Sequence, residues 1–532
     1  MNKQFIRKFN YILYSYAEKL SGSDIDSEEK LHNQVVASIF KIKNLIPEKY
    51  QEHNLERVIA AKSISYNTSL DKSVRQHFYL KKLLYKISKS KTLSSNLSSK
   101  IIDLKETRLK QSMIDKGFED EFLFISSERD LQKDQDKVQL LLFGSQPSHL
   151  KIFDSFLKFS FLKDFKLLIP HKLKDEVILE QVTKEKIIIF EDYFPPNIEK
   201  ELDLLVEEFT EIYHENISVL ENYFQLNGHD YFKTQQPGFK NVFTFLLPQS
   251  LVYSRTANTI LEEFSFSTVM GVRPRRIFDR AILQKAKHLN VHTSLLIHST
   301  LGSEPRELWS SGIYDSCDLV LGWGEKHLQL IKKDKLFDSG NFIKCGSPLF
   351  NSPPRKKDFK IDSPKIIYAS TRNDESIINA LENYKSNNPN IHITIKLHPG
   401  DNQYDKINTN LFSMESGNFA IEEILSSFDL FITSYSGSHL SAISEGIPVI
   451  FTPFFYEFSN DLQTLYGIND KTMSFSYAKN TSQMSNFINR VIEESGYREK
   501  LLNEQQKYFT DLIEEFSMKE SAEKITQVLN LR

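Results

Sequence analysis

Hydrophobic residues follow two different patterns along the chain, and the pattern changes near Asp136. Before that point they recur at helix-like spacing, for example at Phe5, Phe9 and Leu13, and Gly and Pro are almost absent. We therefore expect a helical extension over residues 1–136. Its Lys- and Ser-rich stretch, Lys81–Lys110, predicts a solvated helical face or a flexible connector, with a contact to anionic lipid as the alternative.

After residue 136, short and continuous apolar runs alternate with helical stretches. Parallel strands covered by helices on both faces have this appearance, because neither face is left to polar residues. The first series ends near Ser299 and predicts an α/β lobe over residues 137–312. Its runs are KVQLLLFG, FKLLIP, EKIIIFED, FSTVMGV and HTSLLIHS.

A second series of apolar runs predicts another α/β lobe over residues 313–480. Its runs are CDLVLGW, NFIKCGS, PKIIYAS, IHITIKLHP, FDLFITS and IPVIFTP, with helices expected at Glu325–Lys333, Asp374–Ser386 and Ser438–Glu445. Residues 481–532 return to helical periodicity, which predicts terminal helices that pack back on the lobes. Two doubly wound lobes place ligand crevices at the carboxyl ends of their strands, an arrangement suited to a two-substrate transferase.

Composition and charge exclude several classes of protein. The 67 basic and 70 acidic residues leave a net charge of -3, so no positive field gathers nucleic acid. The two cysteines, Cys317 and Cys345, are too few for a disulfide framework and lack the paired spacing of a zinc site. The N-terminus lacks the apolar core of a signal peptide, and no apolar run reaches the ~18 residues of a membrane span. We expect a cytoplasmic protein, with peripheral contact to the cytoplasmic face of the inner membrane left open.

The segment FDLFITSYSGSHLSAISEGIPVIF predicts a phosphate site at the end of a buried strand. The strand leads into a turn of small hydroxyl residues, after which a helix begins and stops at Gly446. Free backbone N–H groups and the helix dipole favour an anion there, and a carboxylate at the helix end can accept from a sugar or ribose hydroxyl. The alternative is a simple helix cap followed by a surface acid. The candidate donor-binding residues are Ser434, Ser436, Gly437, Ser438 and Glu445.

Two further strand ends in the same lobe carry groups suited to phosphate. In IHITIKLHP, Pro399 fixes the turn, so His398 can contact a phosphate oxygen or exchange protons. In PKIIYASTRND, Ser370 and Thr371 precede Arg372, whose guanidinium can clamp a phosphate. A structural histidine and a helix-start salt bridge are the respective alternatives.

In the first lobe, His298 follows the strand of HTSLLIHS and lies where a crevice is expected, whereas His292 precedes that strand. His298 can act as a general base on an acceptor hydroxyl, or it is a structural histidine. The charged residues after the preceding strand either line the same acceptor side or pair among themselves. They are Arg273, Arg275, Arg276 and Asp279.

These motifs resemble those of bacterial enzymes of the two-lobed GT-B type that build surface carbohydrates. The histidine–proline and serine turns resemble those of bacterial sialyltransferases and of capsule or lipopolysaccharide transferases, in which they contact nucleotide phosphates. IHSTLGS, YASTRND, KLHPGD and TSYSGS also resemble motifs of the CDP-glycerol glycerophosphotransferases, which implies His298 as base and His398 as a phosphate or donor contact. Ser299 and Ser434 stand where that family has glycine and an acid. The first lobe shows no clear acid-acid-glycine motif of the sialyltransferases.

The residues and the resemblance together predict an α/β fold of two Rossmann-like lobes, of the GT-B type, with an N-terminal helical extension. The predicted function is transfer of a sugar from a CMP-, CDP- or UDP-linked donor to a surface-polysaccharide or oligosaccharide acceptor, with His298 and His398 catalytic. A CDP-polyol phosphotransferase, a sugar-nucleotide 2-epimerase and a non-catalytic GT-B-like scaffold stay open. No cofactor or metal is expected, because such enzymes neutralise the leaving phosphate with side chains, and because Asp24–Asp26 and Asp134–Asp136 lie outside the strand ends.

Overall fold

The computed structural model describes two parallel sheets with their helices, and part of the N-terminal region. The described residues are 34, 37–38, 40–55, 138–176, 181–226, 229–272, 276–298, 317–331, 341–355, 359, 363–370, 375–397, 407–408, 410–415, 421–434, 436–452, 477–478 and 480–531. Most of the predicted helical extension, including Lys81–Lys110, lies outside them.

The first sheet has seven strands in the order β3-β2-β1-β6-β7-β8-β9. Its central strand β1 pairs in parallel with β2 on one side and with β6 on the other. The strands are β1 (Leu140–Phe143), β2 (Phe165–Ile169), β3 (Ile187–Ile189), β6 (Thr268–Gly271), β7 (His292–Leu296), β8 (Leu319–Gly322) and β9 (Phe342–Lys344). A separate antiparallel pair joins β4 (Gln225–Leu226) to β5 (His229–Asp230).

The second sheet has five parallel strands in the order β12-β11-β10-β13-β14. They are β10 (Lys365–Ala369), β11 (His392–Lys396), β12 (Ser413–Glu415), β13 (Leu430–Thr433) and β14 (Val449–Phe451). In both sheets the chain adds two strands on one side of its first strand, then returns to the other side of that first strand. This is the doubly wound order, and it confirms the predicted α/β fold with two Rossmann-like parallel sheets.

Strands β8 and β9 belong to the first sheet by hydrogen bonding, whereas the sequence analysis placed their runs in the second series. Continuous apolar runs identify strands but not the sheet that receives them, because strand pairing is non-local. The chain also divides into two spatially compact units. The first unit comprises Met1–Pro147, Asp164–Leu295 and Trp309–Asp318, and the second comprises Ser148–Lys163, Leu296–Leu308 and Leu319–Arg532. The predicted boundaries at residues 136, 312 and 480 stay a prediction.

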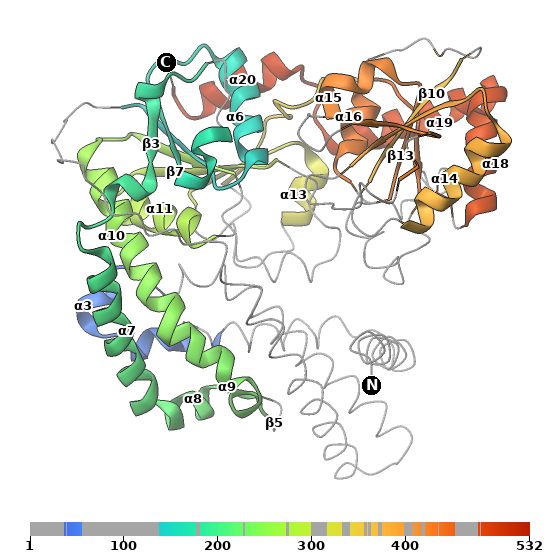
Figure 1. The fold of residues 1–532 in the computed structure, drawn as a ribbon. Helices are drawn as coiled ribbons and strands as arrows, with labels where there is room; N and C mark the ends of the chain where they lie inside the picture. The colour runs from blue at the N-terminus through green and yellow to red at the C-terminus, as the bar shows by residue number, and fades with distance from the viewer. Residues whose placement is uncertain are drawn as a thin grey trace. The chain divides into compact units, whose positions relative to one another are not determined.

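Helices of the first unit pack beside its strands, and α7 and α10 run side by side in Figure 1. A π-helical turn, η5 (Val242–Leu246), joins α9 to α10. The described helices of this unit are η1 (Lys41–Leu45), α3 (Glu48–Gln51), η2 (His171–Glu176), η3 (Lys184–Lys186), η4 (Phe190–Tyr193), α7 (Ile198–Glu215), α8 (Ile217–Tyr223), α9 (Tyr231–Asn241), α10 (Leu247–Glu263) and α11 (Ile277–His288).

The described helices of the second unit are α6 (Pro147–Ser160, with Pro147 in the first unit), α13 (Glu325–Ile331), α14 (Glu375–Asn387), α15 (Ile421–Ile424), η8 (Leu425–Ser427), α16 (Ser438–Ser444), α18 (Thr481–Glu493), α19 (Ser495–Leu512) and α20 (Met518–Val528). Of these, α13, α14 and α16 correspond to the three helices expected from the sequence. Among the described helices none is long and apolar enough to cross a membrane.

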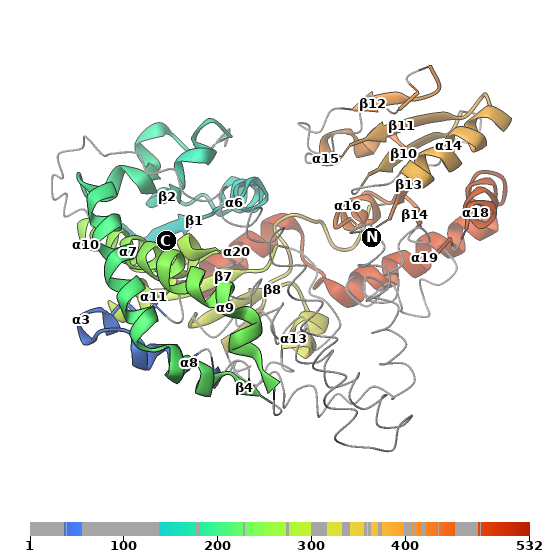
Figure 2. The ribbon, with the colours of Figure 1, turned by 60° about the horizontal axis from the view of Figure 1, so that its bottom comes forward.

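Alternate residues of the five-stranded sheet build a core against α14, α18 and α19. Figure 2 shows the five strands in their order with α14 and α18 beside them. Each buried aliphatic side chain in this layer contributes about 1.5–3 kcal/mol relative to exposure. The layer includes Ile366, Tyr368, Ile393, Ile395, Leu430 and Ile432 from the strands, and Ile377, Leu381, Met484, Ile488 and Leu501 from the helices.

Strand β14, at one end of this sheet order, is covered by a side chain in place of another strand. Buried Gln505 of α19 donates from Nε2 to the carbonyl of Val449 at 2.7 Å and accepts from the N–H of the same residue at 3.0 Å. The amide thereby acts as a short strand neighbour and leaves this part of β14 closed to further pairing.

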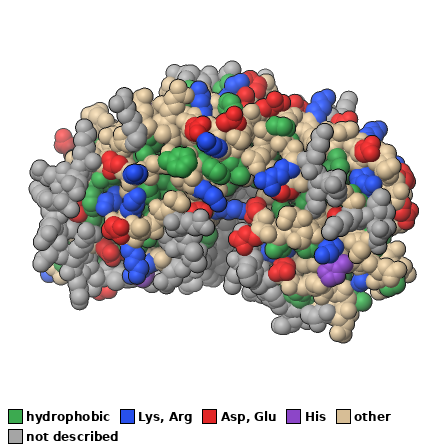
Figure 3. Space-filling model, turned by 90° about the horizontal axis from the view of Figure 1, so that it is seen from above, with side chains coloured by type: hydrophobic (Ala, Val, Ile, Leu, Met, Phe, Trp, Pro, Cys, Tyr) green, Lys and Arg blue, Asp and Glu red, His purple; other side chains and the backbone are tan. Residues whose placement is uncertain are grey.

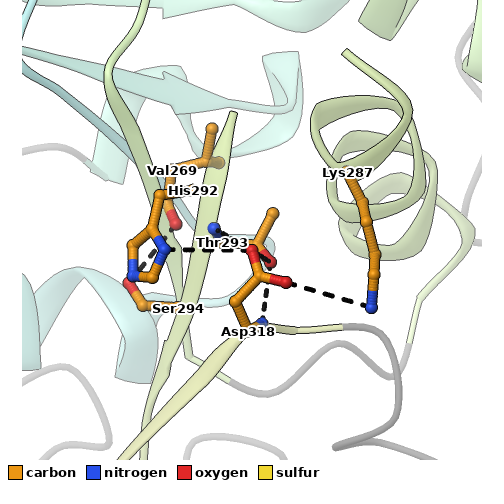
Figure 4. Close-up of polar contacts among 6 residues, drawn as sticks. All are labelled: Val269, Lys287, His292, Thr293, Ser294 and Asp318. Atoms are coloured by element: carbon orange, nitrogen blue, oxygen red, sulfur yellow. Dashed lines mark hydrogen bonds and ion pairs between the residues drawn. The ribbon is translucent and has the colours of Figure 1, made fainter. Parts of the chain in front are cut away.

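An aspartate immediately before a strand fixes the register of its neighbour at three places. Asp164, Asp318 and Asp429 each accept a hydrogen bond, at 2.9–3.0 Å, from a backbone N–H at the start of the adjacent strand. The donors belong to Gln139, Thr293 and Lys365. Figure 4 shows the Asp318 example, in which the carboxylate also accepts from the Thr293 hydroxyl at 2.9 Å. We refer to these three arrangements as the aspartate clasps.

Both cysteines are buried, and neither is in a disulfide. Burial raises the pKa of the Cys345 thiol to about 12, so it stays protonated and unreactive at neutral pH. On the surface, Figure 3 shows basic and acidic side chains interspersed over the face in view, in keeping with the nearly balanced charge of the sequence.

Candidate functional site

The carboxyl edge of the five-stranded sheet brings three strand ends together. The N–H of Ser370, just after β10, donates to the carbonyl of Lys396 at the end of β11 (2.9 Å). On the other side of β10, the Thr433 hydroxyl donates to the carbonyl of Ala369 (3.1 Å). Strand order reverses between β10 and β13, and ligands of doubly wound sheets bind at such a switch point. Ser370 and Ser434 directly follow the two strands that flank it.

The serine turn is built largely from its own hydrogen bonds. Ser436 and Ser438 are half-buried, and their hydroxyl oxygens lie 2.6 Å apart. Ser434 is fully buried, and its hydroxyl reaches only Thr452 at a long 3.5 Å. Gly437 is exposed and has an ordinary helical backbone, and an added methyl group there would meet no atom of the described residues within 4 Å. Space at Gly437 is therefore open on the solvent side of the turn.

The helix after this turn, α16, spans only seven residues. A dipole is the sum of its aligned peptides, so this helix offers an anion less than the longer helix in a nucleotide-binding fold. The predicted phosphate site therefore relies more on hydroxyls and formal positive charge than on a helix dipole.

Lys396 supplies such a charge, and the sequence analysis passed over it. It is the last residue of β11, and only 5% of it is exposed. Burial lowers the pKa of its ammonium group, and the carboxylates of Glu415 and Glu422 act in the opposite direction. Its position at a strand's carboxyl end was visible in the sequence, since it directly precedes Leu397 and the predicted histidine–proline turn, but its burial was not.

His439 supports the serine turn through a hydrogen bond, and it was not among the residues predicted from the sequence. Its Nδ1 lies 2.6 Å from the carbonyl of Ser436, so Nδ1–H donates to the turn. The ring is completely buried and packs edge-on against Phe451. Burial lowers the pKa of His439 to about 4, which keeps the imidazole neutral.

Glu445 has a partner in the structure. Its Oε2 accepts from Arg355 Nη1 at 3.1 Å, and the Arg355 N–H donates to the carbonyl of Ser444 at 2.9 Å. The second oxygen of Glu445 remains a predicted contact for a donor hydroxyl. Thr371, Arg372, His398 and Pro399 lie outside the described residues, so their predicted roles stay predictions.

His298 is half-buried at the end of β7, and the residue before it is firmly held. The Ile297 N–H donates to the carbonyl of Leu321 at 3.0 Å, and the Ile297 carbonyl accepts from Trp323 Nε1 at 2.7 Å. The His298 ring meets the ring of His149 edge-on, with centroids 5.3 Å apart. His292 opens β7 at the opposite edge of the sheet, beside the Asp318 clasp in Figure 4.

The charged residues after β6 are partly accounted for. Asp279 is buried in the first turn of α11, where it accepts from the Ser145 hydroxyl at 2.8 Å and from the Arg276 N–H at 3.3 Å. The latter contact caps α11, so Asp279 has a structural role there. Arg273 and Arg275 lie outside the described residues.

Glu191 is a candidate that the sequence analysis did not select. It follows β3 in the turn η4, is 6% exposed, and accepts from the His171 N–H at 2.7 Å. His171 itself follows β2, so this carboxyl lies at the carboxyl edge of the first sheet. Burial raises the pKa of Glu191 to about 7, and the N–H of His171 opposes that shift. The signal was the triplet EDY after the apolar run III, in which Tyr193 replaces the glycine of an acid-acid-glycine motif.

Among the described residues no group of three or more His, Cys, Asp or Glu side chains is arranged to hold a metal ion. The acidic triplets at Asp24–Asp26 and Asp134–Asp136 lie outside those residues.

No protein-family model matches the sequence, and no curated protein sequence matches it either. Solved structures of similar fold include UDP-GlcNAc 2-epimerase from Neisseria meningitidis bound to UDP-GlcNAc (TM-score 0.47, 12% identity, 74% of this chain and 100% of that chain). Others are the glycotransferase of kitacinnamycin (0.45, 9%, 74% and 99%) and the spinosyn rhamnosyltransferase SpnG complexed with thymidine diphosphate (0.41, 12%, 74% and 100%). At TM-scores below 0.5 these similarities assign no activity to this chain.

Proposed function

We propose that the protein is a GT-B-type glycosyltransferase that moves a sugar from a nucleotide-activated donor to a surface-polysaccharide or oligosaccharide acceptor. The observation that carries this proposal is the switch point of the five-stranded sheet. Ser370 and Ser434 flank it, and the buried ammonium group of Lys396 lies on the strand next to β10. Hydroxyls and a desolvated cation at one strand edge suit a phosphate group better than a neutral ligand.

In this proposal Lys396 and the serine turn stabilise the negative charge that develops on the leaving nucleotide phosphate. A preorganised cation in a dry site is worth more than the same cation in water, because little reorganisation is needed during the reaction. Arg372 and His398 keep their predicted roles as further phosphate contacts.

Glu191 is the proposed general base. The acceptor hydroxyl oxygen attacks the anomeric carbon of the donor sugar, its proton passes to the Glu191 carboxylate, and the bond from the anomeric carbon to the phosphate oxygen breaks. A carboxyl group whose pKa is raised to about 7 is half ionised near neutral pH and holds a proton well, which suits a base at that pH. His298, the base candidate predicted from the sequence, then becomes a second proton-accepting candidate at the carboxyl edge of the seven-stranded sheet.

A nucleotide panel tests the donor site. We expect at least one of CMP, CDP, UDP, GDP, CMP-sialic acid, CDP-glycerol and UDP-GlcNAc to raise the melting temperature, and the matching activated donor to release its nucleotide. Lys396→Met should reduce the shift at the same nucleotide concentration. Lys365→Met is the matched control, because Lys365 is exposed at the opposite end of β10. No shift with any nucleotide would leave the chain as a non-catalytic scaffold.

The same panel separates the rival enzymes. Turnover of CDP-glycerol with transfer of its polyol phosphate would replace the glycosyltransferase by a phosphotransferase. Conversion of UDP-GlcNAc into its 2-epimer without an acceptor would replace it by an epimerase.

A further inference from the structure

We infer that Tyr193 and Glu263 are positioning residues that hold the Glu191 turn in place for proton transfer. This inference rests on the proposed role of Glu191. It concerns how a base on a weak structural element is kept in one orientation.

The element that carries Glu191 is weak by itself. Strand β3 has only three residues, ends the sheet order, and pairs with β2 alone. The turn η4 that follows is a four-residue 3₁₀ helix. Short 3₁₀ segments have poorer hydrogen-bond geometry than α-helices, so packing must supply most of the order.

Three contacts hold the turn. The Glu191 carbonyl accepts from the Phe194 N–H at 3.2 Å, and its carboxylate accepts from the His171 N–H at 2.7 Å. In the third contact, the Tyr193 hydroxyl donates to Glu263 Oε1 at 3.1 Å, and both side chains are buried. Glu263 is the last residue of α10, so this contact ties the turn to a seventeen-residue helix.

Aromatic packing supports the same arrangement. The Phe190 ring, fully buried, meets Phe278 edge-on at 4.9 Å and lies against Tyr253 of α10 at 5.0 Å. Apolar packing alone lets a short turn rotate about its axis, whereas a directional hydrogen bond to Glu263 fixes the rotation. The Tyr193–Glu263 bond therefore fixes the backbone of the turn, and the His171 N–H holds the Glu191 carboxylate itself.

The pH dependence of activity reports on this arrangement. The charges that act on the Glu191 carboxyl come from Asp192 on its own turn and from Lys172 on η2, and His171 lies beside it. Burial is the largest cause of its raised pKa. If the turn loosens and water enters, that burial is lost, and the pKa of Glu191 falls toward its ordinary value. The acid limb of the pH–rate profile should then move to lower pH.

The test compares Tyr193→Phe with Tyr384→Phe, using nucleotide release from whichever activated donor of the panel is turned over. Tyr384 is the matched control, because it is buried and its hydroxyl also donates to a side chain, to the half-buried Asn489 at 2.7 Å, in the other unit. We expect Tyr193→Phe to lower kcat about tenfold with little change in donor KM and to move the acid limb to lower pH. Tyr384→Phe should leave both unchanged. Glu263→Gln, which keeps an acceptor oxygen, should restore most of the loss expected for Glu263→Ala.

A second readout needs no turnover. Amide hydrogen exchange in the peptide that contains η4 should be faster in Tyr193→Phe and unchanged in Tyr384→Phe. Unchanged exchange and an unchanged pH profile in Tyr193→Phe would overturn the inference. Full activity of Glu191→Gln would instead overturn the proposed base, whatever the exchange data show.

Discussion

At the scale of single residues, the functional candidates are the ionisable groups that the fold keeps out of water. Lys396 and Glu191 both lie at carboxyl edges of parallel sheets. Burial lowers the pKa of Lys396 and raises that of Glu191, so it favours the neutral form of each side chain. Such shifts are common at functional sites. Burying a charged group costs desolvation free energy, so buried ionisable groups are found mainly where they have a function.

Lys396→Met should separate stability from function. Burial lowers the pKa of Lys396, so the folded state binds this proton less tightly than the unfolded state, and the charged form opposes folding at neutral pH. We expect the variant to be more stable by about 1 kcal/mol in urea unfolding. Nucleotide affinity should fall about ten- to hundredfold, the loss of one charge-assisted hydrogen bond. A variant that is both less stable and undiminished in affinity would show that Lys396 is structural.

His327→Phe should reduce the sensitivity of the fold to acid. His327 is fully buried against Trp323, and its Nε2 has no hydrogen-bond partner among the described residues. Burial lowers its pKa from 6.5 to about 3, so below pH 6.5 the unfolded state takes up a proton that the folded state refuses. Stability is therefore lost as the pH falls from 6.5.

Between pH 7.5 and pH 5 the parent protein should lose about 2 kcal/mol more unfolding free energy than the variant. His53 and His439 shift in the same direction but are present in both proteins, so their effects cancel. Equal pH dependence of parent and variant in urea unfolding would contradict this account.

Some of these residues could be predicted from the sequence and others could not, for physical reasons. The serine turn was visible because small hydroxyl residues rarely gather after a buried strand without a cap or a ligand. Lys396 was overlooked because a single lysine in a strand usually extends to solvent, and burial depends on neighbours far away in the chain. Glu191 was overlooked because Tyr193 interrupts the expected motif, although the acid follows a strand as clearly as His398 does.

At the scale of elements, continuous apolar runs located the strands well. All eleven runs that the sequence analysis identified contain a strand of one of the two sheets. Strand β12 was missed, because Ser413–Glu415 is short and only partly buried at the end of its sheet order. The runs did not show that β8 and β9 pair with the first sheet, because the sheet that a strand joins depends on contacts distant in sequence; by compactness both strands fall in the second unit, as their predicted lobe implies.

The aspartate clasps give an element-scale prediction. Asp429 is buried, and its carboxylate fixes the N–H of Lys365 where β10 begins. Asp429→Ala leaves that N–H without its acceptor, and we expect a loss of about 1.5–3 kcal/mol in urea unfolding. Asp429→Asn keeps an acceptor oxygen and should lose less. Glu382→Ala, at a partly exposed position on α14, is the control and should change stability by less than about 0.5 kcal/mol. Equal effects of Asp429→Ala and Glu382→Ala would remove the clasp as a stabilising feature.

At the scale of the whole molecule, the proposed function gives the two doubly wound sheets different roles. The five-stranded sheet carries phosphate-competent groups at its switch point, and the seven-stranded sheet carries a buried carboxyl group at its carboxyl edge. The sugar, the nucleotide and the acceptor are not determined by strand order, because the same fold accommodates many reactions. They depend on side chains around the edges of the sheets.

The most direct test of the account is a structure with the nucleotide that gives the largest thermal shift. We predict that its phosphates lie at the carboxyl edge of the five-stranded sheet, between Ser370 and Ser434 and within hydrogen-bonding distance of Lys396. Phosphate density anywhere else would contradict the proposed donor site.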